Sequence, residues 1–202
     1  NQLNRNYLKI KNELVSINNC LNRVAASEIV SNTNYPAGDN TAFDGFAVNS
    51  KETKNLSNNR SQKFKIIKIL AAGDNPNIKG VKKYSTAEVM TGTIIQKPFD
   101  TIIPVEEIEY FPNKTNAKYI VIKKKLKKFE FIRPKGSDYK KGSKIVKKGQ
   151  LIYPSHILAL KTLGIEKVLV KKKVNIVFYP TGNEITNQKN IPSWKIRNSN
   201  TI

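Results

Sequence analysis

The chain has 202 residues, one cysteine, one histidine and a formal net charge of +21 at pH 7. These counts exclude an internal disulfide and Cys- or His-rich metal clusters, so we interpret Cys20 as a buried structural thiol. No apolar run is long enough to cross a bilayer and no signal-peptide pattern occurs. The sequence therefore predicts a cytoplasmic protein with no membrane partner.

The excess of positive charge suggests nucleic acid, but its composition argues against that partner. Of the 36 basic residues, only five are arginine, the residue that base reading and bidentate phosphate contacts favour. We therefore expect no nucleic-acid partner. The densest basic segment, residues 123–149, is interpreted as a solvated strand-and-loop surface, with a patch for an anionic ligand as the alternative.

The first pattern along the chain is helical. Leu14, Ile17, Leu21 and Val24 recur at spacings of three and four residues, which predicts an amphipathic helix that Ser16 could cap. The following "NYPAGDN" is rich in turn-forming residues and predicts a loop.

Short strand-like segments then follow one another up to residue 135. They are "GFAVNS", "SQKFKIIKIL", "TAEVM", "DTIIPVEEIEYF", "KYIVIKKKL" and "FEFIR". Five or six short strands separated by turns predict a small barrel or sandwich. Glu106, Glu107 and Glu109 are expected on a strand, facing solvent.

The last third changes character. Pro154 and Gly164 are placed as the opening and the end of a helix, with His156 near its start as a surface residue. "KVLVKKK" predicts a strand. From Val174 a nearly continuous apolar strand is expected to run into Thr181 and Gly182, as at the start of a parallel α/β sheet.

Four segments, taken in order, resemble the molybdopterin molybdenumtransferases, the family of the MoeA proteins and of the E domain of gephyrin. The segments are "LNRVAASEIVSNTNYPAGDNTAFDGFAV", "AEVMTGTIIQKPFDTIIPVEE", "FIRPKGSDYKKGSKIVKKGQLIYPSHILALKTLGIEKVLVKKKVNIVFYPTGNEI" and "KIRNSN". The chain departs from the family pattern at Glu88, where arginine is usual, and at Ser137, where glutamate is usual. It also carries no Gly-Gly-[ST]-Ser loop.

The resemblance implies a mixed α and β, multidomain fold. Residues 1–30 and 142–172 would form an elongated α/β linking domain, and residues 31–141 an inserted β-rich, barrel-like domain. Residues 173–202 would supply the first strand of an incomplete α/β molybdopterin-binding domain.

The resemblance also implies an activity. The family inserts molybdate into adenylylated molybdopterin and releases AMP, with Mg²⁺, as a cytoplasmic homodimer of the full-length protein. The 202-residue chain alone is expected to be inactive. The alternative is a non-catalytic dimerisation or scaffold module of a gephyrin-like protein.

The family motifs assign candidate site residues. The catalytic candidates are Asp44, Thr91 and Asp138, and the metal candidate is Glu184. Candidates for the pterin nucleotide are Thr181, Gly182, Asn198, Ser199 and Asn200.

Without the family resemblance, local sequence preferences suggest structural rather than catalytic roles for several of these residues. Asp44 suits an Asx turn, Thr91 an ordinary strand end, and Asp138 a turn that neutralises nearby lysines. Asp39 is expected to brace its loop, and Gly45 to let the backbone turn sharply so that the Asp44 carboxylate projects outward.

Overall fold

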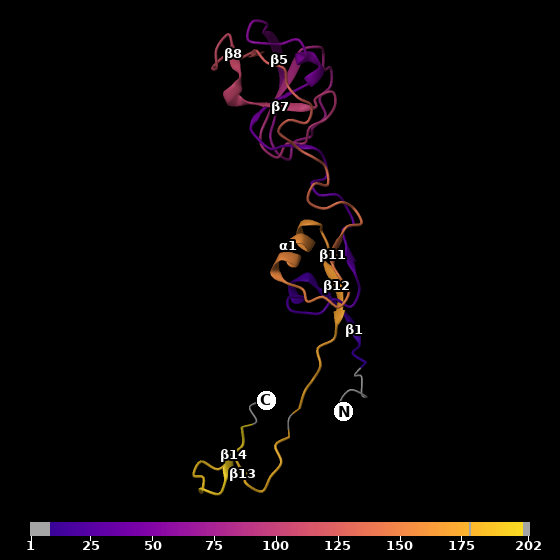
Figure 1. The fold of residues 1–202 in the computed structure, drawn as a ribbon, viewed down its shortest axis with the longest axis vertical. Coiled ribbons are helices and arrows are strands. Elements are labelled where there is room, and N and C mark those ends of the chain that lie inside the picture. The colour runs from indigo at the N-terminus through magenta and orange to yellow at the C-terminus, as the bar shows by residue number, and fades with distance from the viewer. Residues whose placement is uncertain (1–8, 178, 200–202) are drawn as a thin grey trace.

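A computed structural model describes residues 9–177 and 179–199. The molecule is elongated, and four parts follow one another along its axis (Figure 1). We call residues 40–133 the sheet body, residues 31–39 and 134–143 the neck, residues 12–30 and 144–171 the helix body, and residues 172–199 the tail. No helix among the described residues is long and apolar enough to cross a membrane.

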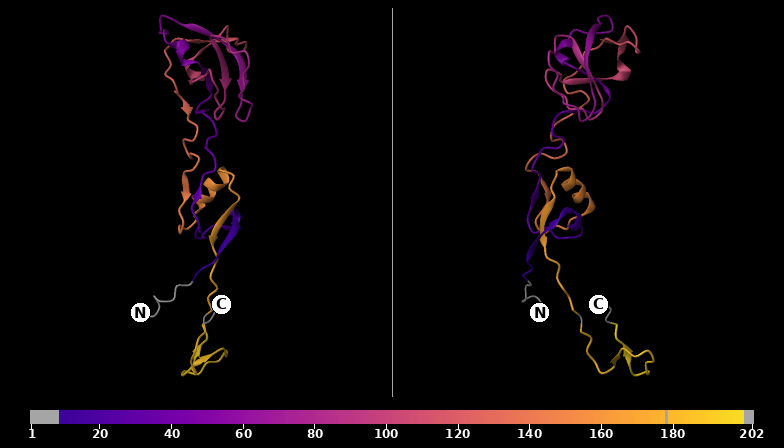
Figure 2. Two further views of the ribbon diagram at one scale, coloured as in Figure 1. Left: turned by 90° about the vertical axis from the view of Figure 1, so that its right-hand side faces the viewer. Right: turned by 180° about the vertical axis from the view of Figure 1, so that it is seen from behind.

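A six-stranded sheet organises the sheet body. In spatial order its strands are β7 (Thr101–Pro104), β4 (Gly45–Val48), β6 (Ser85–Val89), β5 (Gln62–Leu70), β9 (Tyr119–Ile122) and β8 (Glu109–Phe111). Within this sheet, only β5 and β6 pair in parallel. The sheet curls, with β7 and β8 as its two edges (Figure 2).

Strands β4 and β7 are buried on both faces of the sheet, which explains why both are continuous apolar runs. Side chains alternate between faces along a strand. Phe46 and Val48 therefore belong to one apolar cluster with Phe64, whereas Ala47 belongs to another with Leu70. The strands predicted in this region are confirmed, although Glu106 and Glu107 lie on a 3-10 turn (Val105–Glu107) rather than on a strand.

The helix body surrounds a second, separate core. Strand β1 (Asn12–Ser16) pairs with β12 (Lys167–Lys171), and β2 (Ile29–Val30) with β11 (Lys144–Val146), both antiparallel. Helix α1 (Pro154–Thr162) packs Leu160 into this core. The predicted helix is confirmed, with Pro154 at its start and Gly164, at φ +69°, just after its end.

The amphipathic helix predicted from Leu14 to Val24 is wrong. The segment forms β1, one 3-10 turn (Ile17–Asn19) and irregular chain. Leu14 and Leu21 are 62 % and 45 % exposed, so the helical spacing does not describe a buried face. Pairing with β12 determines the conformation, since tertiary contacts outweigh weak local preferences. Ser16 caps the 3-10 turn, accepting from the Asn18 N–H at 3.4 Å.

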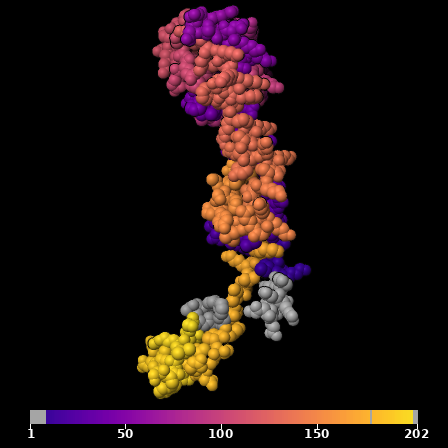
Figure 3. All heavy atoms as spheres, in the orientation of Figure 1, coloured from indigo at the N-terminus to yellow at the C-terminus, as the bar shows by residue number. Residues whose placement is uncertain are grey.

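The neck consists of two chain segments that run side by side (Figures 2 and 3). Tyr35 and Tyr139 exchange both backbone hydrogen bonds, at 2.7 and 3.0 Å. At its sheet end, β3 (Asn40–Thr41) pairs with β10 (Ile132–Arg133). Nearer the helix body, the Ser31 N–H donates to Ser143 O at 2.9 Å. The neck is thus a hydrogen-bonded ribbon that joins the two bodies.

The apolar strand expected from Val174 is not formed in the described residues. Residues 172–177 are extended without strand pairing, and Ile176 and Val177 are 59 % and 64 % exposed. The tail instead pairs β13 (Ile185–Thr186) in parallel with β14 (Ile196–Arg197). The described fold is therefore mostly β with one helix, and the domain limits expected from the sequence stay a prediction.

Candidate functional site

Asp44 and Thr91 are brought together by the pairing of β4 with β6. Asp44 immediately precedes β4, and Thr91 follows β6 by two residues. The strands are antiparallel with Gly45 opposite Val89, so these two ends are neighbours. The Thr91 N–H and hydroxyl both donate to Asp44 Oδ1, at 2.6 and 2.7 Å. Two candidates identified separately in the sequence therefore form one hydrogen-bonded pair.

The pair holds Asp44 as an ionised, accessible carboxylate. The Thr91 backbone N–H, and then its hydroxyl, lower the pKa of Asp44 because both stabilise the charged form. Asp44 is exposed, and its Oδ2 makes no hydrogen bond within the described residues. This oxygen is available to a cation or to a hydrogen-bond donor on a ligand.

Gly45 has a different role from the one expected. Its φ is outside the left-handed region, so no sharp glycine-dependent turn occurs there. A Cβ at this position would instead overlap the carbonyl oxygen of Ile103 on β7. Glycine is needed because the backbones of β4 and β7 approach closely, which fixes the strand that follows Asp44.

The loop before Asp44 is braced from the returning half of the neck. Asp39 Oδ1 accepts from the Lys135 N–H at 2.7 Å, which confirms the bracing role expected for Asp39. Phe43 is 52 % exposed and packs edge-on against Phe131, with ring centroids 5.2 Å apart. These contacts hold the Asp44 loop against the chain that leaves the sheet body.

Asp138 lies apart from this pair, in the neck. Its carboxylate forms an ion pair with Arg133 and accepts from the Ser137 hydroxyl at 3.3 Å. The Arg133 hydrogen bond lowers the pKa of Asp138. The expectation that this aspartate neutralises lysines is wrong, because its partner is an arginine. No hydrogen bond connects Asp138 with Asp44 or Thr91 in the described part of the chain.

The remaining candidates gather in the tail. Pairing of β13 with β14 places the Glu184 backbone beside Ile196, and the Ile196 N–H donates to Glu184 O at 2.8 Å. In the same pairing, the Asn198 N–H donates to Thr186 O at 3.0 Å. The Glu184 carboxylate folds over Gly182. Thr181, Gly182, Glu184 and Ser199 are exposed, and Asn200 lies outside the described residues.

Two groups of candidates therefore occupy opposite ends of the molecule. The Asp44–Thr91 pair belongs to the sheet body, whereas the tail group lies beyond the helix body (Figure 1). Within residues 9–177 and 179–199, no three His, Cys, Asp or Glu side chains form a potential metal cluster. Any metal held by Glu184 would need further oxygen ligands from elsewhere.

Residues 1–164 match the family model of the MoeA N-terminal region, domains I and II. The chain belongs to this family. It is 32 % identical over 188 residues to a molybdopterin molybdenumtransferase of Staphylococcus aureus (strain N315), covering 92 % of this chain and 43 % of that protein. The corresponding enzyme of Bacillus subtilis (strain 168) is 29 % identical over 189 residues, covering 93 % of this chain and 44 % of that protein.

Two solved structures of MoeA proteins from Pyrococcus horikoshii share the fold. Both are 28 % identical, with TM-scores of 0.84 and 0.75. They cover 97 % and 88 % of this chain, which in turn spans 49 % and 45 % of theirs. The chain thus spans less than half the length of these MoeA relatives.

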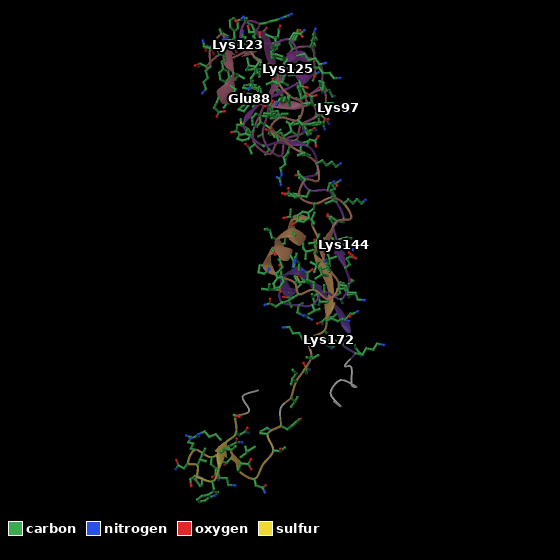
Figure 4. The ribbon with its side chains drawn as sticks, viewed as in Figure 1. Glu88, Lys97, Lys123, Lys125, Lys144 and Lys172 are labelled. Atoms are coloured by element: carbon green, nitrogen blue, oxygen red, sulfur yellow. The ribbon has the colours of Figure 1, made fainter. Side chains whose placement is uncertain are left out.

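The structure locates one residue that departs from the MoeA family pattern, Glu88, and one further residue beside a candidate, Arg133. Glu88, at the position where arginine is usual, is half-exposed on β6 opposite Phe46, within the sheet body (Figure 4). Arg133 is not among the candidate residues that the sequence indicates, although it is the partner of Asp138. Its signal was available: opposite charges five residues apart flank the turn-forming "PKGS".

The densest basic segment extends over both bodies of the molecule. Lys123 and Lys125 lie on the sheet body and Lys144 on the helix body (Figure 4). Lys123 pairs with Glu109, and Lys144 pairs with Glu28 at 2.8 Å. The lysines of residues 123–149 are therefore spread over both bodies, as the interpretation of a solvated surface expects, and the alternative of a patch for an anionic ligand stays a prediction.

Proposed function

We propose that this chain is the N-terminal portion of a molybdopterin molybdenumtransferase. The whole protein would insert molybdate into adenylylated molybdopterin, release AMP and require Mg²⁺. Membership of the MoeA family and relatives named molybdopterin molybdenumtransferase support a role in molybdenum cofactor biosynthesis. Because the chain spans less than half of those relatives, we propose that activity requires sequence beyond the matched part.

The Asp44–Thr91 pair is the observation that carries the proposal. An ionised carboxylate with one free oxygen, next to a hydroxyl, supplies the oxygen groups needed to place Mg²⁺ or an oxyanion with its counter-ion. In this proposal Asp44 and Thr91 act at the molybdate end of the reaction. Asp138 is the third catalytic candidate and is oriented by Arg133.

The tail supplies the nucleotide side of the site. Glu184 is an exposed carboxylate, and Mg²⁺ is often held by one or two carboxylates together with substrate phosphate oxygens. Glu184 fits that mode, in which bound Mg²⁺ would neutralise charge developing on the departing AMP. Thr181, Gly182, Asn198, Ser199 and Asn200 would contact the pterin nucleotide.

A homodimer would reconcile the two separated groups. The sheet body and the tail of one chain lie at opposite ends of the molecule (Figure 1). We therefore propose that Asp44 of one subunit completes the site formed by the tail of its partner in a cytoplasmic homodimer. Contacts within one chain do not bring these groups together.

The test is turnover of the full-length protein with Asp44→Asn. Asparagine keeps the acceptor for Thr91 but removes the charge, so turnover should fall about 10²-fold, or about 2.7 kcal/mol of transition-state stabilisation. Melting temperature should be unchanged. Asp74→Asn is the matched control, because Asp74 is also a turn aspartate, whose Oδ2 accepts from the Ala71 N–H at 2.8 Å.

The competing scaffold function makes the opposite prediction. A non-catalytic module would tolerate Asp44→Asn with no change in any rate. Asp44→Asn turnover equal to that of Asp74→Asn would remove Asp44 from the site. Absence of molybdenum insertion by the unmutated full-length protein, with dimerisation retained, would favour the scaffold.

A further inference from the structure

A basic groove opens at the other end of the β4–β6 pair from Asp44. Because the two strands are antiparallel, the end that carries Asp44 and Thr91 is opposite the end where β4 leads into the 3-10 turn Ser50–Thr53 and where Tyr84 leads into β6. A groove of about 370 Å³ is lined there by residues 51, 52, 54–56 and 60–62 together with Lys83 and Tyr84. Neither the MoeA site proposed above nor the apolar cores account for it.

Four cationic side chains line this groove without an acidic partner. Lys51, Lys54, Arg60 and Lys83 are all exposed. Each ion pair of the described chain involves other residues. The only carboxylate in the groove is Glu52, and its Oε2 is engaged by the Tyr84 N–H at 2.7 Å. The groove therefore has four cations against one carboxylate, an excess of positive charge that raises the local concentration of anions.

The frame that carries these cations is fixed by specific contacts. Ser57 and Arg60 exchange backbone hydrogen bonds of 3.1 and 2.9 Å, which closes a tight turn and presents Arg60. Tyr84 adopts a left-handed φ of +57°, which is rare for a bulky residue. Its ring packs edge-on against Phe64, with centroids 5.6 Å apart. Such strained conformations are retained where surrounding contacts determine them, and often at binding sites.

The second polar cavity of the sheet body is a weaker candidate. It measures about 510 Å³ and is lined by Lys51, Lys97 and Lys128, but also by Asp39 and Asp100. Its carboxylates offset most of its positive charge. The smaller groove combines more cations with an arginine, whose guanidinium binds phosphate in a bidentate manner.

We propose that the groove between residues 51–62 and Lys83–Tyr84 binds a small polyphosphate anion. Several closely spaced charges on one ligand match four cations around a concave site better than a single-charge anion does. The groove and its bound anion would act independently of the Asp44–Thr91 pair, since they lie at opposite ends of the two strands.

Isothermal titration of the 202-residue chain with inorganic triphosphate tests the proposal. The double variant Arg60→Gln, Lys83→Gln should weaken binding about tenfold or more. The matched control, Lys147→Gln with Lys148→Gln, removes the same net charge from exposed residues of the helix body and should bind within about twofold of wild type. Lys54→Gln alone should weaken binding about threefold, which provides a milder variant if the double variant unfolds.

Three results would overturn the proposal. Equal weakening by the groove variant and the control would show attraction to net charge only. A wild-type Kd weaker than about 1 mM at low salt would show no site. Tighter binding of a single-stranded ribonucleotide decamer than of triphosphate, lost in the groove variant, would assign the groove to nucleic acid instead. Turnover of the full-length protein does not enter this test, so its outcome is separate from that of the proposed transferase.

Discussion

Replacing Gly45 by alanine should weaken the sheet body severely. The new Cβ would overlap the Ile103 carbonyl oxygen and would lie 3.0 Å from the Ile103 carbonyl carbon and 3.1 Å from Ile102 Cγ2. Carbon atoms in contact prefer separations of about 3.5–4.0 Å. Strand β7 would therefore have to move away from β4 by about 0.5–1 Å.

The expected loss of stability depends on which atoms obstruct the new methyl group. Ile103 O and C are backbone atoms of a strand paired with β4 from Gly45–Pro104 to Val48–Thr101, so they cannot rotate aside. Overpacking of this kind costs about 1–3 kcal/mol, and a backbone obstacle puts Gly45→Ala near about 3 kcal/mol. At about 4–8 °C per kcal/mol for a unit of this size, the melting temperature should fall by about 12–24 °C.

Thermal unfolding followed by circular dichroism measures this effect. Gly38→Ala is the matched control, because its nearest neighbour is a side-chain atom, Ile94 Cγ2, 3.1 Å away, and Ile94 is 37 % exposed and can shift. That variant should lose less than about 1 kcal/mol. If Gly45→Ala melted within about 2 °C of wild type, the close approach of β4 and β7 would not be the reason for glycine.

Three further results are expected. Arg23→Met should lower the free energy of unfolding of the helix body by about 2 kcal/mol, because Arg23 is buried, pairs with Glu13 and donates to Lys171 O at 2.7 Å. The urea midpoint should fall accordingly, and an unchanged midpoint would contradict this. Arg133→Gln should raise the pKa of Asp138 towards its ordinary value, measured by carboxyl NMR titration. Since a lowered folded pKa gives stability that is present above the ordinary pKa and lost as pH falls through the folded value, wild type should lose more stability in acid than the variant does. Burial raises the pKa of the Cys20 thiol, whose Sγ donates to Ile17 O at 3.0 Å, so a disulfide reagent should react slowly until urea unfolds the chain; rapid reaction in native buffer would contradict burial.

Local sequence patterns predicted the elements whose signals are local. Helix α1 was recognisable because Pro154 and Gly164 mark its two ends. Strand β4 was recognisable as a short apolar run next to turn-forming residues. In both cases the residues that determine the element lie inside it or beside it.

Features that depend on distant partners were not predictable in the same way. Residues 12–16 form strand β1 because they pair with β12, which lies about 150 residues later in the chain, as in the pair Ser16–Lys167. The Asp44–Thr91 contact depends on the register of β4 against β6, which local sequence does not specify. Asp44 and Thr91 were each identified from family motifs, but their hydrogen bonds required the fold.

The hydrogen bonds at the base of the neck suggest how such a chain could gain or lose a domain in evolution. Ser31 and Gly142–Ser143 are joined by backbone hydrogen bonds, so the chain leaves the helix body and returns to it at one point. The buried core of the helix body uses residues 17–29 and 146–170 and none between them. A short turn that connects residue 31 to residue 142 would leave that core whole. A single genetic deletion or insertion could therefore remove or add the entire sheet body as a cassette, with the helix body remaining a complete folding unit.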